Sequence, residues 1–221
     1  MKWVTIAASI MLCCCTPSSL RGVQAASLSS IQRSGDVFGH PGVALRHASG
    51  AAASVLTHGA HVASWVPGAG APPGLFMSEL ARFGKGEAVR GGIPVCFPQF
   101  GPRGPLAQHG FCRRSDEWQI SKEEVLPNGD VRAVLTLTDS EETRASAWPH
   151  RFVLDYEVVL GADSLTTGLS LRNTGEGELS FTCALHSYFP VADIGQASVV
   201  GLKGCEYEDG TAGGAVLGGA G

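Results

Sequence analysis

The sequence lacks a basic excess: 16 Lys and Arg residues face 20 Asp and Glu residues, and the formal net charge is -4. Domains that bind nucleic acid normally carry clustered positive charge, so we expect no nucleic-acid partner. The apolar run from Trp3 to Cys15 is shorter than the ~20 residues that a membrane-spanning helix requires. We therefore expect no permanent membrane span, a monomeric state, and a small molecule as the partner.

Several motifs of cofactor and nucleophile chemistry are also missing. No Cys-x-x-Cys or comparable metal spacing occurs, and His58 and His61 lie in a predicted turn, not on one face of a helix. Gly91-Gly92 is not followed by Gly-Lys-Ser/Thr, which excludes a P-loop. Ser115 and Ser187 stand outside any nucleophile elbow. These motifs therefore give no support for a metal site, a phosphate-binding loop or a serine nucleophile.

No acidic residue precedes Asp36, and the first 25 residues differ from the rest. Lys2, an apolar run and the small residues around Ala25 follow one another in the order of a cleaved signal peptide. Because Ser, Ala and Arg are frequent, a plastid transit peptide fits as well. We predict a targeting segment at 1–25, for the secretory pathway or a plastid, and a linker at 26–36. A misassigned start codon would instead leave the protein cytoplasmic.

Cysteine is sparse outside that segment. Of the seven cysteines, three lie within 1–25, and the other four are Cys96, Cys112, Cys183 and Cys205. Four cysteines allow three disulfide pairings, and the sequence does not choose among them. Buried free thiols are the favoured state, although export would make a disulfide possible.

Long helical patterns are absent, and short apolar runs alternate with turn residues, which is typical of an all-β sandwich or barrel. The expected strands span 43–46, 52–57, 62–66, 118–125, 131–138, 152–160, 165–173, 179–185 and 199–202. Two of them alternate clearly, with Val131, Ala133, Leu135 and Leu137 on one face, and Leu165, Thr167, Leu169 and Leu171 on another. Asn128-Gly129 predicts a tight hairpin turn. The Gly/Ala-rich tail at 210–221 is expected to form no strand.

The stretch from Arg90 to Arg114 contains too much Gly and Pro for a helix or a regular strand. It also contains apolar residues, among them Ile93, Val95 and Phe97, which argue against a solvent-exposed linker. A rigid loop that carries arginines and a histidine is typical of a surface that binds a polar or anionic ligand.

Two histidines and two arginines are the candidates for chemistry. His109 lies within this loop, and His186 ends an apolar strand beside a turn. Imidazole titrates near neutral pH, which suits proton transfer; the alternative is a half-buried ring satisfied by backbone carbonyls. Arg90 and Arg113 bracket the loop, and guanidinium groups bind phosphate or carboxylate bidentately. Surface salt bridges are the ordinary alternative for both arginines.

Four blocks of sequence, in this order, resemble the glucose-6-phosphate 1-epimerase branch of the aldose 1-epimerase (galactose mutarotase-like) family. They are RGGIPVCFPQFG at 90–101, HGFCR at 109–113, LHSYF at 185–189 and GLKGCEYED at 201–209. Cys112 departs from the family, where alanine is more usual. The resemblance implies a galactose mutarotase-like β-sandwich (supersandwich) at 37–209, with no metal or organic cofactor.

The resemblance also implies a reaction, the interconversion of the α and β anomers of glucose 6-phosphate or related hexose 6-phosphates. An acid protonates the ring oxygen while a base takes the proton of the C1 hydroxyl. By resemblance, His186 is the acid and His109 orients or polarises the ring oxygen. Arg90 and Arg113 match the positions that hold the phosphate.

Gln99 lies in the first block and Asp193 follows His186, and by the same resemblance both are expected to bind the substrate. The family's base is a glutamate downstream of Asp209, whereas the sequence ends at Gly221. We therefore expect a sandwich without its C-terminal strands, and impaired turnover. The alternative function is a non-catalytic module that binds sugar phosphates.

Overall fold

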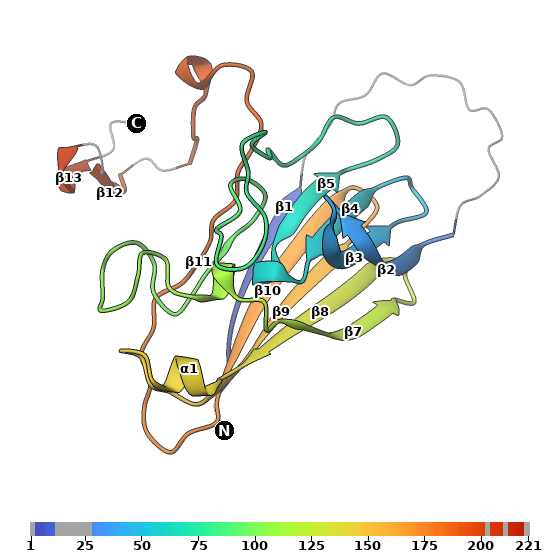
Figure 1. Cartoon of the computed structure of the whole chain (residues 1–221). Coiled ribbons are helices and arrows are strands. Elements are labelled where there is room, and N and C mark those ends of the chain that lie inside the picture. Colours follow the sequence, from blue (N-terminus) through green and yellow to red (C-terminus); the bar gives the residue numbers. More distant parts are fainter. Residues whose placement is uncertain (1–2, 12–27, 202–203, 210–211, 219–221) are drawn as a thin grey trace. The chain divides into compact units, whose positions relative to one another are not determined.

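The computed structural model describes residues 3–11, 28–201, 204–209 and 212–218. The chain divides into two units, Met1–Pro190 and Val191–Gly221, which we describe separately. Most of the regular structure is β (Figure 1). The described residues contain one α-helix and three 3-10 turns, namely α1 (Glu141–Arg144), η1 (His58–Ala60), η2 (Cys112–Arg114) and η3 (Ile194–Gln196). The prediction of an all-β fold is confirmed.

The larger sheet of the first unit is antiparallel and has the strand order β1-β10-β9-β8-β7. Its strands are β1 (Trp3–Met11), β7 (Gln119–Val125), β8 (Val131–Thr138), β9 (Phe152–Leu160) and β10 (Ser164–Asn173). The faces predicted for two of these strands are confirmed, because all eight residues named for β8 and β10 are buried. The turn before β8 also forms as predicted, with Gly129 at a positive φ of 91°.

The smaller sheet has the order β2-β3-β4-β5 and is also antiparallel. Its strands are β2 (Ser30–Val37), β3 (His40–Arg46), β4 (Ala52–Leu56) and β5 (Val62–Val66). The prediction of a linker at 26–36 is wrong for the residues of β2. This strand lies at the edge of the sheet and is held by backbone pairing with β3, so it needs little apolar sequence.

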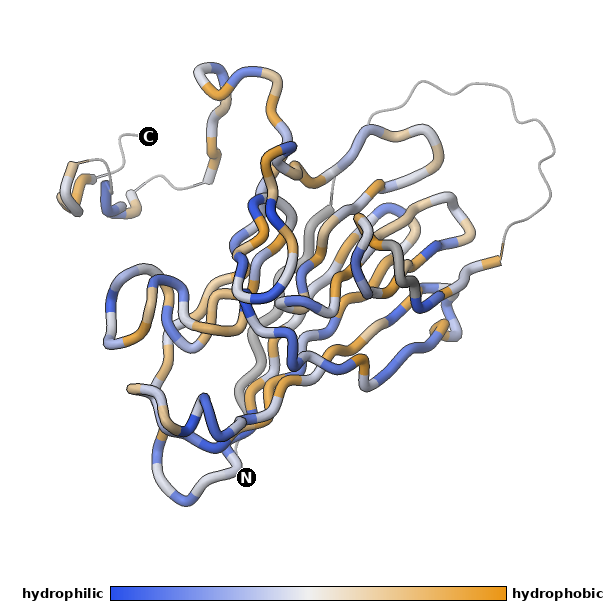
Figure 2. The backbone as a smooth tube through the Cα atoms, viewed as in Figure 1, coloured by the Kyte–Doolittle hydropathy of each residue, from blue (hydrophilic) through white to orange (hydrophobic). Residues whose placement is uncertain are grey.

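One hydrophobic core joins the two sheets. It contains Val55 and Trp65 from the smaller sheet and Leu135 and Tyr156 from the larger one, all buried. Hydrophobic residues recur along the strands, whereas many loop tips are hydrophilic (Figure 2). This is the face-to-face packing of a β-sandwich.

A third pairing joins two short strands, β6 (Val95–Cys96) and β11 (Ala184–Leu185). The sequence predicted a longer strand at 179–185, and that prediction is wrong for the first five of these residues. Pro94 and Pro98 bracket β6, and proline has no N–H to donate to a ladder. Because neither proline can donate a ladder bond, regular pairing is confined to Val95 and Cys96 and their partners Ala184 and Leu185.

The second unit contains η3 and a hairpin of β12 (Glu206–Asp209) and β13 (Ala215–Gly218). The tail was expected to form no strand, and β13 corrects that prediction. No strand forms at 199–201, and position 202 lies outside the described residues. Within the described ranges, no helix is long and apolar enough to cross a membrane.

Of the predicted targeting segment, the structure describes Trp3–Met11, which pairs with β10 as strand β1. The remaining residues of 1–25 lie outside the described ranges, and the targeting function stays a prediction. Cys96, Cys112, Cys183 and Cys205 are free thiols, of which the first two are buried. In the part of the chain that the structure describes, no group of three or more His, Cys, Asp or Glu residues could hold a metal ion.

Candidate functional site

The β6–β11 pairing brings together the two parts of the chain that carry the predicted catalytic histidines. Residues on both sides of β6 continue the contact, since the backbone N–H of His186 donates to the carbonyl of Pro94 over 3.0 Å. The N–H of Tyr188 donates to the carbonyl of Gly92 over 2.9 Å. Residues 186–188 are thereby fixed beside the start of the Arg90–Arg114 loop.

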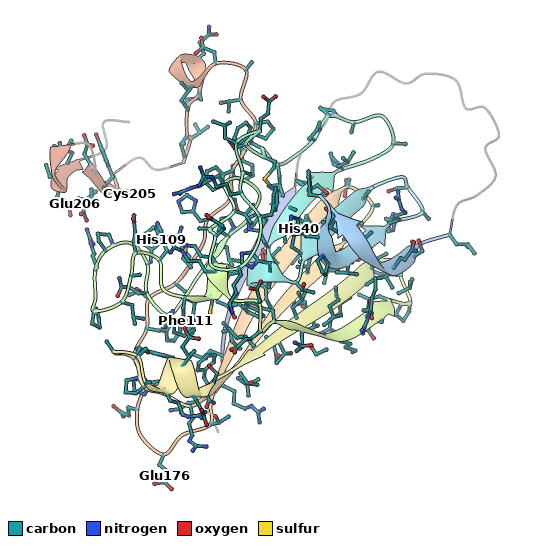
Figure 3. The ribbon with its side chains drawn as sticks, in the orientation of Figure 1. His40, His109, Phe111, Glu176, Cys205 and Glu206 are labelled. Carbon is teal, nitrogen blue, oxygen red and sulfur yellow. The ribbon has the colours of Figure 1, made fainter. Side chains whose placement is uncertain are left out.

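The Arg90–Arg114 loop is anchored to the core by its apolar residues, as the sequence predicted. Ile93, Val95 and Phe97 are fully buried. Phe111 packs against the core, with its ring 6.2 Å from that of Phe152 between centroids. Figure 3 labels Phe111 and His109 on this loop. The loop is therefore a rigid support for its polar residues.

His109 is half-buried and has a left-handed backbone, with φ at 69°. Such a conformation is uncommon outside glycine and indicates a position that the surroundings dictate. The N–H of Gly101 donates to Nδ1 of His109 over 3.1 Å. Because Nδ1 accepts this bond, the proton of the neutral ring sits on Nε2. His109 can therefore donate a hydrogen bond from Nε2.

The surroundings of His109 favour its neutral form. Burial lowers the pKa of His109, and the nearby charges of Arg113, His186 and Arg90 lower it further. A neutral imidazole beside cations can polarise an oxygen atom of a ligand without carrying charge itself.

Four rings form a continuous row across the site. The centroid of Phe100 is 5.4 Å from that of His109, which lies 5.7 Å from that of His186 in an edge-to-face arrangement. His186 stacks on Tyr188 at 5.0 Å. The structure thus brings together the two histidines that the sequence named, and their catalytic role stays a prediction. Phe100 and Tyr188 were not predicted as site residues, although Tyr188 could have been found from its period-two spacing to His186.

Arg113 and Arg90 supply positive charge on the same loop. Arg113 is only 8% exposed, and its Nη2 donates to the carbonyl of Gln108 over 2.9 Å. Its Nε has no hydrogen-bond partner, and burial is the main cause that lowers the pKa of this residue. Arg90 is exposed. The electrostatic influence of both arginines on His109 places them near its ring.

Gln99, predicted to bind the substrate, has its side-chain amide bonded within the loop. Its side chain is 4% exposed, and its Nε2 donates to the carbonyls of Gly101 and Leu106 over 3.0 and 3.1 Å. The N–H of Leu106 in turn donates to Oε1 over 3.0 Å. Gln99 therefore holds together the loop that carries His109, and its contact with substrate stays a prediction.

Asp193 belongs to the second unit, which is described by itself. Its carboxylate accepts hydrogen bonds from the N–H of Gly195 over 2.8 Å and from Nε2 of Gln196 over 3.1 Å. It therefore caps η3, and its predicted contact with substrate stays a prediction.

A separate cavity of about 590 Å³ lies beside the same loop. Phe111, Arg114 and Asp116 line it together with residues of α1 and Lys85. Neither His109 nor His186 lines this cavity, and neither Arg90 nor Arg113 does. The row of rings therefore lies outside this cavity.

A β-sandwich whose loops bring together a histidine pair and two arginines belongs structurally with the sugar mutarotases. The solved structure of a "putative mutarotase (YeaD)" from Salmonella typhimurium superposes with a TM-score of 0.59 at 33% identity, covering 76% of this chain and 53% of that one. A galactose mutarotase related enzyme from Lactobacillus acidophilus superposes with a TM-score of 0.52 at 21% identity, covering 72% and 51%. The galactose mutarotase-like fold is confirmed.

The chain belongs to the aldose 1-epimerase family, whose model matches residues 41–216. It is 40% identical over 174 residues to the Cenchrus ciliaris protein named "Putative glucose-6-phosphate 1-epimerase". That match covers 76% of this chain and 52% of the relative. The chain thus spans about half the length of the relative it matches.

Proposed function

We propose that this protein binds a hexose 6-phosphate and takes part in the interconversion of its α and β anomers. The observation that carries the proposal is the His109–His186 pair, with ring centroids 5.7 Å apart, together with Arg90 and Arg113 on the loop that carries His109. The name of the Cenchrus ciliaris relative supports glucose 6-phosphate as the substrate. The two guanidinium groups suit the phosphate, since they form charge-assisted hydrogen bonds with its oxygens.

The reaction needs one proton given and one proton taken. His186 gives its proton to the ring oxygen as the bond between C1 and that oxygen breaks, while a base takes the proton of the C1 hydroxyl. His109 donates a hydrogen bond from Nε2 to the same ring oxygen and orients it. The open-chain aldehyde rotates about C1–C2 and closes by the reverse transfers.

We assign no base among the described residues, and the resemblance implies a glutamate beyond Asp209. The proton transfers need no nucleophile. Acid and base groups each contribute about 100- to 10,000-fold to such reactions.

The test is anomer exchange of glucose 6-phosphate, measured by NMR exchange spectroscopy. It is run on this chain and on a chain extended through the expected glutamate. We expect exchange above the spontaneous rate, lost in His186→Ala and retained in His40→Ala, a histidine of the smaller sheet. An extended chain that shows only the spontaneous rate, or an unaltered rate in His186→Ala, contradicts the proposal.

A second candidate function is binding of sugar phosphates without turnover. The exposed ring of Phe100 beside His109 favours it, because aromatic rings bind the apolar faces of sugars without any catalytic group. This candidate predicts saturable binding of glucose 6-phosphate in calorimetry, weakened in Arg90→Ala, without anomer exchange. A folded chain that binds no sugar phosphate refutes it.

A further inference from the structure

His61 is a buried polar side chain that the proposed reaction does not use. It lies between η1 and β5 and is 1% exposed. Its Nε2 has no hydrogen-bond partner. Leaving a buried polar atom unpaired is unfavourable, so a histidine at such a position requires an explanation.

The ring of His61 faces the turn at Gly91-Gly92. A Cβ added at Gly92 would lie 2.7 Å from Nε2 of His61 and 2.1 Å from the carbonyl oxygen of Val62. Both glycines have positive φ, 123° at Gly91 and 56° at Gly92, which other residues adopt only with strain. The turn is therefore made of the only residue type that fits beneath this ring.

His61 is neutral at ordinary pH. Burial, with a smaller contribution from the nearby His58, lowers its pKa to about 3. The backbone of Gly91 raises the pKa of His61, because it is an acceptor close to the ring. Nε2 itself has no hydrogen-bond partner of normal geometry.

A metal role for His61 with His58 is excluded by the bonds of His58. Its Nδ1 lies 2.5 Å from a carboxylate oxygen of Asp116, and its Nε2 lies 2.9 Å from the carbonyl oxygen of Glu87. Both ring nitrogens of His58 are therefore engaged by protein groups.

The turn at Gly91-Gly92 connects several parts of the candidate site. The N–H of Gly92 donates to the carbonyl of Phe76 over 2.7 Å, and its carbonyl accepts from the N–H of Tyr188 over 2.9 Å. The carbonyl of Arg90 accepts from the N–H of Ser78 over 3.1 Å. Any movement of this turn therefore moves Arg90 and the segment after β11 that carries the ring of Tyr188.

We infer that His61 is a positioning residue, which supports the Gly91-Gly92 turn from the core and so fixes the direction of Arg90 toward the ligand's phosphate. This inference rests on the proposed function, since it names the phosphate as the group that Arg90 meets. It assigns the role to the shape and polarity of the His61 ring, not to a contact with the ligand.

The test compares His61→Leu with Tyr156→Phe. The Tyr156 hydroxyl is also buried without a hydrogen-bond partner, since Thr167 lies nearby but outside bonding geometry. Both substitutions remove an unpaired polar atom, so neither is expected to lower stability in urea unfolding. We expect His61→Leu to weaken glucose 6-phosphate binding ~10-fold, as a misdirected guanidinium loses part of its bonding, and to leave glucose binding within ~2-fold. Tyr156→Phe should leave both affinities unchanged.

Unaltered affinity for both sugars in His61→Leu overturns the inference, and so does an equal loss for both. If His61→Leu does not fold, two other variants test the same contact. His61→Gln retains a polar end group, and Gly92→Ala places a methyl group against the His61 ring. His61→Gln should keep the affinity for glucose 6-phosphate within ~3-fold, and Gly92→Ala should lose it selectively. A lost affinity in His61→Gln together with a normal affinity in Gly92→Ala overturns the inference.

An amide NMR spectrum without ligand separates this inference from the proposed function. His61→Leu should shift the amide signals of Gly91, Gly92 and Tyr188, whereas Tyr156→Phe should not. If the wild-type protein binds no sugar phosphate but these shifts occur, the proposed function fails while the support of the turn by His61 stands. Unshifted signals at all three amides refute that support.

Discussion

The protein contains two pairs of neighbouring histidines with opposite surroundings. His109 and His186 lie half-buried in an open row of rings, beside arginines on a loop. His58, in η1, and His61, just before β5, are both buried, and His61 lies against the turn at Gly91-Gly92. His109 accepts a hydrogen bond at Nδ1 and is half-buried, whereas Nε2 of His61 is buried and unpaired.

The difference shows that a lowered pKa alone does not identify a catalytic histidine. Burial lowers the pKa of both His109 and His61. Only His109 is exposed enough to reach a ligand, while His61 can act only through the backbone that covers it. The predictions that follow test this contrast, from the largest expected effect to the smallest.

Acid should destabilise the protein through His61. Its folded-state pKa of about 3 lies below the ordinary 6.5, so between these pH values the unfolded chain binds a proton that the folded chain does not. Stability should therefore fall as pH decreases from 6.5, by roughly 4 kcal/mol from this residue at pH 3. Urea unfolding at stepped pH measures the loss. The free energy of unfolding should fall less steeply with decreasing pH in His61→Leu than in the wild type. Equal decreases in the two proteins would contradict the lowered pKa of His61.

His109→Ala should slow anomer exchange about 100-fold, because it removes the donor at the ring oxygen and the bond from Gly101. His109→Asn should fold better than the alanine variant, since asparagine tolerates a positive φ. NMR exchange measures the rate, and thermal unfolding measures the stability. If His109→Ala exchanges the anomers at the wild-type rate, the His109 ring does not take part in the reaction.

Gln99→Leu should destabilise the protein by about 2 kcal/mol, because it leaves the partly buried N–H of Leu106 and two partly buried carbonyls without their partner. Gln119→Leu, on the exposed edge strand β7, is the matched control and should have little effect. Urea unfolding measures both. A stable Gln99→Leu variant with weakened sugar binding would support the prediction that Gln99 contacts the substrate.

Phe100→Leu should have the smallest effect, a loss of about 3-fold in affinity for glucose 6-phosphate. The ring is 45% exposed and stacks only against His109, and an exposed aromatic contact contributes roughly 0.5–1 kcal/mol. Titration calorimetry measures the affinity, with the exposed Leu80→Ala as the control. An equal loss in the control would show that the assay detects surface changes in general.

Much of the sandwich could be predicted from the sequence, because its central strands bury every second side chain. β9 alternates over its whole length, and β5 and β9 have the predicted bounds. β2 and β13 were missed for a shared reason. Both are held by backbone pairing in polar or Gly-rich sequence, where no side-chain pattern marks a strand.

The site was predicted in outline, and its omissions have a physical cause. His109 and His186 were paired through motif resemblance, and a short backbone ladder brings them together. The hydrogen bonds of Gln99 within the loop could not be predicted, because a motif position does not reveal which way a side chain points. His61 was set aside as a weak metal ligand, since burial and an unpaired Nε2 cannot be read from neighbouring residues in the sequence.

The two-residue β6–β11 ladder has a consequence for folding order. Its strands are far apart in the chain, and β7 to β10 lie between them. Contacts between distant segments form slowly, because the intervening chain must first become ordered. We therefore expect the histidine pair to assemble after the larger sheet. A sugar phosphate would then bind only fully folded molecules and protect them from proteolysis, so ligand-dependent protection would report when folding is complete.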